Sequence, residues 1–149
     1  MAKKLEDCAA MYSVEADRSK RLVVISAAGD VTKAEVKAAA QEVRKIMKDA
    51  EPGFRVLTDF RWLHSMEPTA APHVAEIMDA VADKKVASVT RVVPDPKKDI
   101  GLNILSQFHY DPGIPINTFE SLAEALQSMV EESGEIQRSE IKDQTSAVE

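Results

Sequence analysis

Side chains that bind ions and proteins gather in one short part of the sequence, residues 60–69. This stretch contains a guanidinium at Arg61, an indole at Trp62, an imidazole at His64 and a carboxylate at Glu67. Such groups make charge-assisted hydrogen bonds and large contact areas, which are typical of binding surfaces. The pattern contains neither a nucleophile beside a base nor a set of metal ligands, which a catalytic centre would need. The stretch therefore predicts a contact surface without catalysis.

A strand and a helix are expected to position this stretch. Residues 55–60 have the length and the apolar content of a buried strand. A helix is predicted over residues 69–84, because apolar residues recur there at helical spacing, namely Val74, Ile77, Met78 and Val81. We expect a loop at 61–68 and a helix cap at Thr69. The first N–H groups of that helix would then be open to a phosphate, a carboxylate or a phospholipid headgroup.

Strands and helices alternate along the rest of the chain. The predicted strands cover 11–16, 21–26, 55–60, 86–93 and 114–119, and the predicted helices cover 33–50, 69–84, 97–109 and 122–133. This β-β-α-β-α-β-α-β-α order predicts an α/β fold, with a mixed sheet of about five strands and about four or five helices. The first two strands form an antiparallel hairpin, and the centre of the sheet is parallel.

Local signals predict where several of these elements begin. Thr32 and Glu35 have the spacing of a capping box for the first helix, and Ser121 and Glu124 have the same spacing at the last helix. Asp95 is placed to cap the helix at 97–109. Pro115 marks the last strand as an edge strand. We expect the helix at 97–109 to bury four apolar side chains, Ile100, Ile104, Leu105 and Phe108.

The chain length of 149 residues predicts one domain. We place this domain at residues 11–133, after a lead-in at residues 1–10. Residues 134–149 are polar, and we expect them to form a mobile tail.

Composition restricts the class of partner and the compartment. The chain has 25 acidic and 19 basic residues and a net charge of −6, so a nucleic-acid partner is not expected. Cys8 is the only cysteine, which excludes an intrachain disulfide and fits a reducing compartment. No apolar run reaches the roughly 18 residues of a spanning helix, and Glu6 and Asp7 interrupt the segment that a signal peptide would need to be apolar. We expect a cytoplasmic protein without stable membrane insertion.

Three predicted loops, at 27–32, 60–69 and 94–98, follow strands that we expect to be parallel. The carboxyl ends of parallel strands form the rim where ligands and partners tend to bind. The candidate ligand-binding or partner-binding residues on this rim are Asp30, Thr32, Asp59, Arg61, Trp62, His64, Ser65, Glu67, Thr69 and Asp95.

Several of these residues also have a purely structural interpretation. A buried core position is favoured for Trp62, together with Leu63. Asp59 and Glu67 could act as paired acid–base carboxylates, but a carboxylate at a strand end more often binds nearby backbone N–H groups. Thr69 more often caps a helix than accepts a phosphate. The three histidines, His64, His73 and His109, lack partners at metal-ligand spacing, so we expect no metal and no cofactor.

The element order and the central motif resemble the STAS domain of anti-sigma-factor antagonists. In that family a strand ends in an aspartate, and a second aspartate follows eight residues later, just before a phosphorylatable serine at a helix start. Asp59 matches the first aspartate and Glu67 matches the second. Residues 118–126 also resemble the last strand and helix of the family. The resemblance covers about residues 12–129.

Pro68 occupies the position of the phosphorylatable serine and has no hydroxyl group. Thr69 and Ser65 are therefore the candidate phosphorylation sites nearby. The chain looks closer to the sporulation-antagonist-like branch, which is grouped with STAS/Sec14-type domains. The resemblance implies a regulatory module with a protein partner, and that branch suggests reversible binding of a fatty acid or phospholipid.

We therefore predict a single STAS-like domain that is not an enzyme and that recognises a protein partner through the rim around residues 60–69. The alternative is a reversible binder of a lipid or of another small apolar or anionic ligand. The strand that contains Pro115 is either a free edge or the contact of a homodimer.

Overall fold

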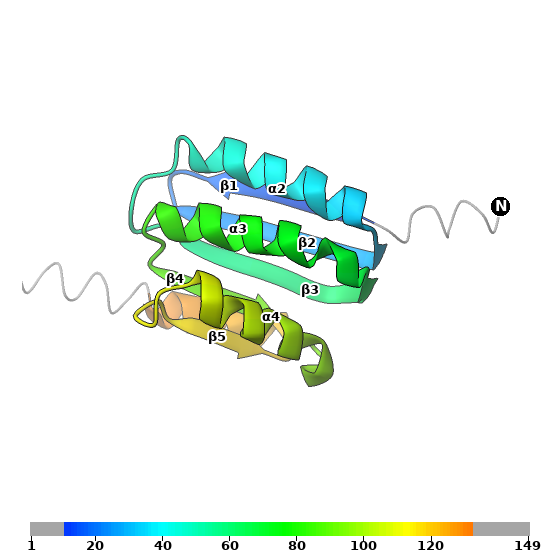
Figure 1. The fold of residues 1–149 in the computed structure, drawn as a ribbon. Coiled ribbons are helices and arrows are strands. Elements are labelled where there is room, and N and C mark those ends of the chain that lie inside the picture. The colour runs from blue at the N-terminus through cyan, green and yellow to red at the C-terminus, as the bar shows by residue number, and fades with distance from the viewer. Residues whose placement is uncertain (1–10, 133–149) are drawn as a thin grey trace, which may run out of the picture.

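The computed structural model describes residues 11–132, with the side chains of all of them except residues 96 and 98–100. A five-stranded sheet forms its centre (Figure 1). The strands lie in chain order across the sheet: β1 (Met11–Asp17), β2 (Leu22–Val31), β3 (Arg55–Met66), β4 (Ser88–Val92) and β5 (Ile116–Phe119). β1 is antiparallel to β2, and the other neighbouring strands are parallel. The predicted mixed sheet with an opening hairpin is confirmed.

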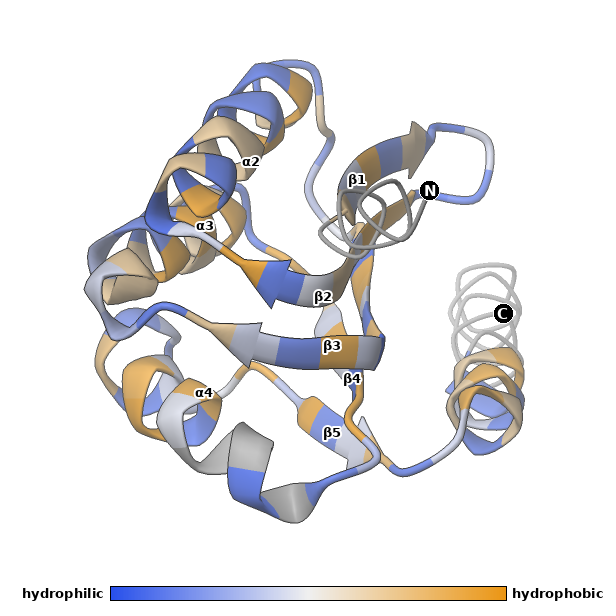
Figure 2. Cartoon of the chain, turned by 90° about the vertical axis from the view of Figure 1, so that its right-hand side faces the viewer, coloured by the Kyte–Doolittle hydropathy of each residue, from blue (hydrophilic) through white to orange (hydrophobic). Residues whose placement is uncertain are grey.

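Helices cover the two faces of the sheet unequally (Figure 2). One face carries three α-helices, which are α2 (Lys33–Met47), α3 (Ala71–Asp83) and α4 (Pro96–His109). The opposite face carries the helical residues 122–132. The expected lead-in at 1–10 and tail at 134–149 lie outside the described residues. Within residues 11–132, every helix is too short or too polar to cross a lipid bilayer.

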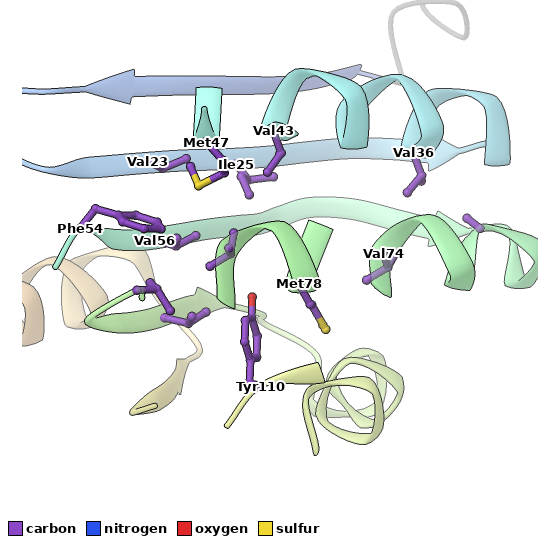
Figure 3. Close-up of a cluster of buried hydrophobic side chains, with 14 of the residues drawn as sticks. Val23, Ile25, Val36, Val43, Met47, Phe54, Val56, Val74, Met78 and Tyr110 are labelled. Carbon is purple, nitrogen blue, oxygen red and sulfur yellow. The ribbon is translucent and has the colours of Figure 1, made fainter. Parts of the chain in front are cut away.

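A hydrophobic core fills the space between the sheet and α2 and α3 (Figure 3). Its buried side chains include Val23, Ile25, Val43, Met47, Val56, Val74 and Met78. A smaller core on the opposite face contains Leu57, Val92, Ala125 and Met129. Successive side chains of a strand point to opposite faces, so β3 supplies Val56 to one core and Leu57 to the other.

The caps predicted from sequence hold three helices in place. Thr32 and Glu35 form the expected capping box of α2, and the Asp95 carboxylate accepts the backbone N–H of Lys97 at 3.0 Å. The hydroxyl of Ser121 accepts the backbone N–H of Glu124 at 3.3 Å before the helical residues 122–132. A capping residue satisfies an N–H group that the helix leaves without a partner.

Two predicted loops are wrong, because both segments continue as strands. β2 extends to Val31 and β3 extends to Met66, and the two extensions pair with each other. The last pair between β3 and β4 joins Asp59 to Val92. The stretch 60–66 therefore projects beyond β4 as a strand. It is held by pairing with β2 and by the half-buried packing of Leu63 and Met66 against the main core.

The predicted start of the helix at 69–84 is also wrong. A short 3-10 helix, η1 (Pro68–Ala70), precedes α3, and Thr69 lies inside it. Ala70 occupies the N-cap position of α3 without a side-chain hydrogen bond. The hydroxyl of Thr69 instead donates to Glu67 Oε2 at 3.5 Å. Thr69 is thus not a helix cap, because the chain already turns helical at Pro68.

Two of the four side chains expected inside α4 are exposed. Ile104 is 51% exposed and Phe108 is 80% exposed. The helix instead directs Ser106 at the sheet, where this residue and Asn103 bind the guanidinium of Arg91 on β4. Leu105 does pack against the main core, and the side chain of Ile100 lies outside the described ones. The apolar pattern is therefore only partly correct for α4, because the buried arginine on the neighbouring strand requires polar partners.

The ionisation of Tyr110 lowers the stability of the folded protein at alkaline pH. Its side chain is buried, and this burial raises the pKa of Tyr110 to about 12, while the charge of Arg91 lowers it and that of Asp79 raises it. The pKa of tyrosine in an unfolded chain is about 10. The unfolded state therefore loses its proton first, so stability falls as pH rises from about 10 to about 12, by about 1.4 kcal/mol per pH unit.

Urea unfolding of the native chain and of Tyr110→Phe at a series of pH values measures this contribution. Between about pH 9 and pH 12 the native chain is expected to lose on the order of 2 kcal/mol more than the variant. Lysine deprotonation affects both proteins equally and cancels in the difference. Parallel profiles for the two proteins would show that Tyr110 does not titrate in this way.

Candidate functional site

An ion pair on β3 begins the candidate site. Arg61 Nε donates to Asp59 Oδ1 at 3.0 Å, and a terminal guanidinium nitrogen donates to Oδ2 at 3.0 Å. The backbone N–H of Arg61 donates to Asp59 Oδ1 at 3.1 Å. The hydrogen bond to Asp59 raises the pKa of Arg61 above its ordinary value, and the guanidinium stays charged. Asp59 thus holds the Arg61 side chain in one orientation beside Trp62. Two parallel charge-assisted hydrogen bonds give such a pair a defined geometry.

Trp62 is exposed, so its predicted place in the core is wrong. The side chain is 71% exposed, and the Arg61 guanidinium lies 5.7 Å from the centroid of its ring. β3 has one more residue than β2 between the pairs Ser26–Asp59 and Ala28–Trp62. This bulge turns Trp62 to the same face as Ala28, opposite α2 and α3. Leu63 takes the inward position instead.

A second cluster lies at the ends of β2 and β3. Asp30 Oδ1 lies 2.6 Å from His64 Nδ1 and accepts the Ser65 hydroxyl, also at 2.6 Å. A second register shift makes this possible, because it places Asp30 beside Ser65 and leaves His64 as the additional residue. Gly29 has a φ of +74° at this irregularity, a conformation that glycine adopts at little cost. Both contacts meet at one carboxylate oxygen, so the imidazole does not activate the hydroxyl.

Glu67 closes the helix end next to these clusters. Its backbone N–H donates to the carbonyl of Val31 at 3.0 Å, and its Oε2 accepts the backbone N–H of Lys33 in the first turn of α2 at 3.1 Å. Thr32 belongs to the capping box at the same helix end. Thr32 and Glu67 therefore both stabilise the start of α2, which is a structural role.

The predicted site residues divide into four groups. Asp59, Arg61 and Trp62 lie on the sheet face that carries residues 122–132, and Asp30, His64 and Ser65 lie at the strand ends. Glu67, Thr32 and Thr69 surround the start of α2 and η1, while Asp95 binds the first turn of α4.

Sequence reasoning missed a serine pair beside Asp59. Ser26 is in register with Asp59, and its Oγ lies 2.7 Å from Ser13 Oγ on β1. The three polar side chains form a row across the sheet. Alternation of polar and apolar residues in β1, where Ser13 precedes Val14, was the available signal for this row.

Two of the hollows in the described residues have apolar side chains in their walls. An apolar cavity of about 70 Å³ lies between the sheet and the helices, with Phe60, Met78 and Tyr110 in its wall. A groove of about 400 Å³ lies beside the β1–β2 turn and the end of α2, with Ile46 and Phe54 in its wall. Within the part of the chain that the structure describes, no three or more His, Cys, Asp or Glu side chains converge on a common metal position.

Solved structures share this fold. No family model matches the chain, and no curated protein matches it in sequence. An uncharacterised protein of the DUF3478 family from Shewanella loihica, described as having a SpoIIAA-like fold, is 14% identical, with a TM-score of 0.59 over 79% of this chain and 91% of that chain. The chain has a SpoIIAA-like fold.

Two anti-sigma factor antagonists have the SpoIIAA-like fold in common with this chain. The protein from Mycobacterium paratuberculosis is 17% identical, with a TM-score of 0.53 over 80% of this chain and 92% of that chain. Unphosphorylated SpoIIAA itself is 16% identical, with a TM-score of 0.55 over 81% of this chain and 98% of that chain. The STAS-like architecture implied by the sequence resemblance is therefore confirmed. Within this SpoIIAA-like fold, Pro68 begins η1.

Asp59→Asn tests how the SpoIIAA-like scaffold holds Arg61. The variant keeps the size of the side chain but removes its charge, so the positive charge of Arg61 is no longer balanced beside Trp62. Iodide is an anion, and we expect it to quench Trp62 fluorescence more strongly in the variant than in the native chain. Quenching by neutral acrylamide should change less. Thermal stability should fall moderately, because the Arg61 side chain is 34% exposed whereas that of Asp59 is only 16% exposed.

Asp95→Asn is the matched control for this experiment. It removes one negative charge elsewhere and keeps a residue that caps helices well. Iodide quenching that rises equally in both variants would show that the total charge, and not the Asp59–Arg61 pair, controls access to Trp62.

Proposed function

We propose that this chain is a non-enzymatic regulatory module that recognises a protein partner through the end of β3. The contact surface, called here the β3-end surface, consists of Asp30, Arg61, Trp62, His64, Ser65 and Glu67. The observation that carries the proposal is the 71% exposure of Trp62, a large aromatic side chain next to an arginine that Asp59 holds in position. Tryptophan and arginine are enriched among the residues that dominate binding energy at protein interfaces.

The shape of this surface favours a protein over a small molecule. Small ligands bind in clefts of roughly 300–1,000 Å³ that enclose most of their surface. Trp62, His64 and Ser65 instead project from the end of a strand and are exposed. An exposed aromatic side chain with polar groups around it is suited to a flat partner surface that excludes water on contact.

The comparisons support a regulatory role at the level of fold. Two of the solved structures with this fold are named anti-sigma factor antagonists. We infer a cytoplasmic setting from the single cysteine, Cys8, which fits a reducing compartment. Ser65 and Thr69 are the proposed phosphorylation sites on or beside the β3-end surface, because both residues are exposed.

A lipid ligand has less support than a protein partner. The apolar cavity of about 70 Å³ is well below the size of a typical ligand pocket. The groove of about 400 Å³ has the required size. Its rim, however, carries the ion pairs Arg18–Asp49 and Arg21–Glu51, at 3.3 and 3.9 Å, and an acyl chain would have to pass between them.

Affinity capture from the source cells tests the proposal. The full chain and the double variant Arg61→Ala/His64→Ala serve as baits, and bound proteins are quantified by mass spectrometry. We expect at least one protein that is captured by the native chain and depleted about tenfold or more with the variant, since each truncated contact of this kind costs about 1 kcal/mol or more.

Arg44→Ala is the control bait, because Arg44 forms a surface ion pair with Glu76 at 3.5 Å between α2 and α3. Thermal unfolding of all baits shows that they are folded. Identical sets of captured proteins for the native chain and the double variant would refute the proposed role of the β3-end surface.

A further inference from the structure

The two edges of the sheet are built differently. β5 has four residues and follows Pro115, so it offers few backbone groups to another strand. β1 has seven residues, contains no proline, and keeps an unbroken register with β2 from Met11–Ala28 to Asp17–Leu22. Natural edge strands are normally protected by short length, proline, bulges or charges. Of these protections β1 has only the charges of Glu15 and Asp17.

We propose that β1 pairs with β1 of a second copy of this chain, so that two sheets join into one. About a two-fold axis perpendicular to the sheet, the two identical strands pair in antiparallel orientation. An axis at Val14 uses all seven residues, with Val14 opposite the partner's Val14. Tyr12 then lies opposite the partner's Ala16, and Ser13 lies opposite the partner's Glu15. The N–H and C=O groups of β1 that point away from β2 can then form hydrogen bonds with the second copy.

The side chains of β1 suit this arrangement on both faces. Tyr12 lines the apolar cavity, Val14 packs against the main core, and Ala16 lines the groove beside α2. All three therefore face the α2 side of the sheet. The seam, which is the line where the two β1 strands pair, would continue the apolar layer from one copy to the other. Tyr12 is 38% exposed without this contact.

The opposite face of the seam is polar and free of direct charge repulsion. Met11 lies opposite the partner's Asp17, and Ser13 lies opposite the partner's Glu15, so no two carboxylates face each other directly. Like charges directly opposite would destabilise the pairing. The two copies of Glu15 are diagonal neighbours, which weakens the pairing, and the dimer should therefore be stronger for Glu15→Gln.

The size of the seam predicts a weak dimer. The surface area that one strand pair buries is smaller than the roughly 1,200 Å² that stable complexes bury. We therefore expect an equilibrium between monomer and dimer that shifts with protein concentration. This proposal is independent of the partner bound at the β3-end surface.

Sedimentation velocity of the full chain over a series of concentrations tests the proposal. We expect a sedimentation coefficient that rises with concentration for the native chain. Ala16→Lys places a charge on the apolar side of the seam and should abolish this rise, while Asn117→Lys, which adds the same charge on β5, should not. A chain that stays monomeric at all concentrations, or a dimer that Ala16→Lys does not weaken, would overturn the proposal.

Cysteine crosslinking tests the register. In a Cys8→Ser background, Val14→Cys places two thiols opposite each other across the axis, where Cα atoms lie about 4.5–5.5 Å apart. This separation permits a disulfide, whereas Ser13→Cys is offset from its own copy and should crosslink much less. Equal or stronger crosslinking of Ser13→Cys would overturn the proposed pairing about Val14.

Discussion

Trp62→Ala is expected to remove capture of the partner while leaving thermal unfolding nearly unchanged. The side chain is 71% exposed, so its removal takes little apolar area out of the folded core. At an interface, truncation of a central tryptophan typically costs about 2 kcal/mol or more, which is a loss of affinity of about 30-fold or more. Titration of the captured protein with the native chain and with the variant measures this difference.

Phe108→Ala is the matched control for Trp62→Ala. Phe108 is also a large aromatic side chain, 80% exposed, but it lies on α4. If exposed apolar area alone drives the capture, both variants lose it to a similar degree. Loss of affinity for Phe108→Ala with full affinity for Trp62→Ala would move the contact surface to α4 and refute the proposal.

We expect Arg91→Ala to lower the free energy of unfolding more than Trp62→Ala, Asp59→Asn or Arg44→Ala does. Arg91 is 2% exposed in the centre of the sheet. Its guanidinium donates to Asn103 Oδ1 at 3.2 Å and to the hydroxyl of Ser106, and so ties β4 to α4. Hydrogen bonds from a charged group are worth about 1.5–3 kcal/mol each. Truncation also leaves buried polar partners and a cavity, so we expect a loss of about 3 kcal/mol or more.

Urea unfolding measures this loss, with Arg44→Ala as the control. Arg44 also joins two elements through its guanidinium, by an ion pair with Glu76, but 58% of its side chain is exposed. A surface ion pair of this kind contributes at most about 1 kcal/mol. Equal destabilisation by the two substitutions would contradict the role assigned to the buried contact between Arg91 and α4.

Local sequence patterns predicted the order of the elements well. Runs of β-branched residues such as residues 21–26 mark strands that are buried on both faces. Thr32, Asp95 and Ser121 each have the side chain and the spacing of a cap, and each forms a capping hydrogen bond in the structure. These signals act within a few residues, so a single sequence is sufficient to find them.

The continuation of β2 and β3 could not be predicted in the same way. Arg61, His64 and Ser65 interrupt the apolar pattern, so the end of β3 has the composition of a loop. Its strand geometry depends on pairing with β2, and the contact of His64 with Asp30 joins residues 34 positions apart. The bulge that turns Trp62 outward and Leu63 inward is likewise a property of the paired strands.

Trp62 fluorescence tests the central claim most directly. Trp62 is the only tryptophan in the chain, so its emission reports on the β3-end surface alone. The free chain should show the long-wavelength emission of an exposed indole and strong quenching by iodide. Addition of the captured partner, in a form without tryptophan, should shift the emission to shorter wavelength and suppress the quenching. Emission and quenching that stay unchanged while the partner is bound would contradict the claim that Trp62 lies in the contact.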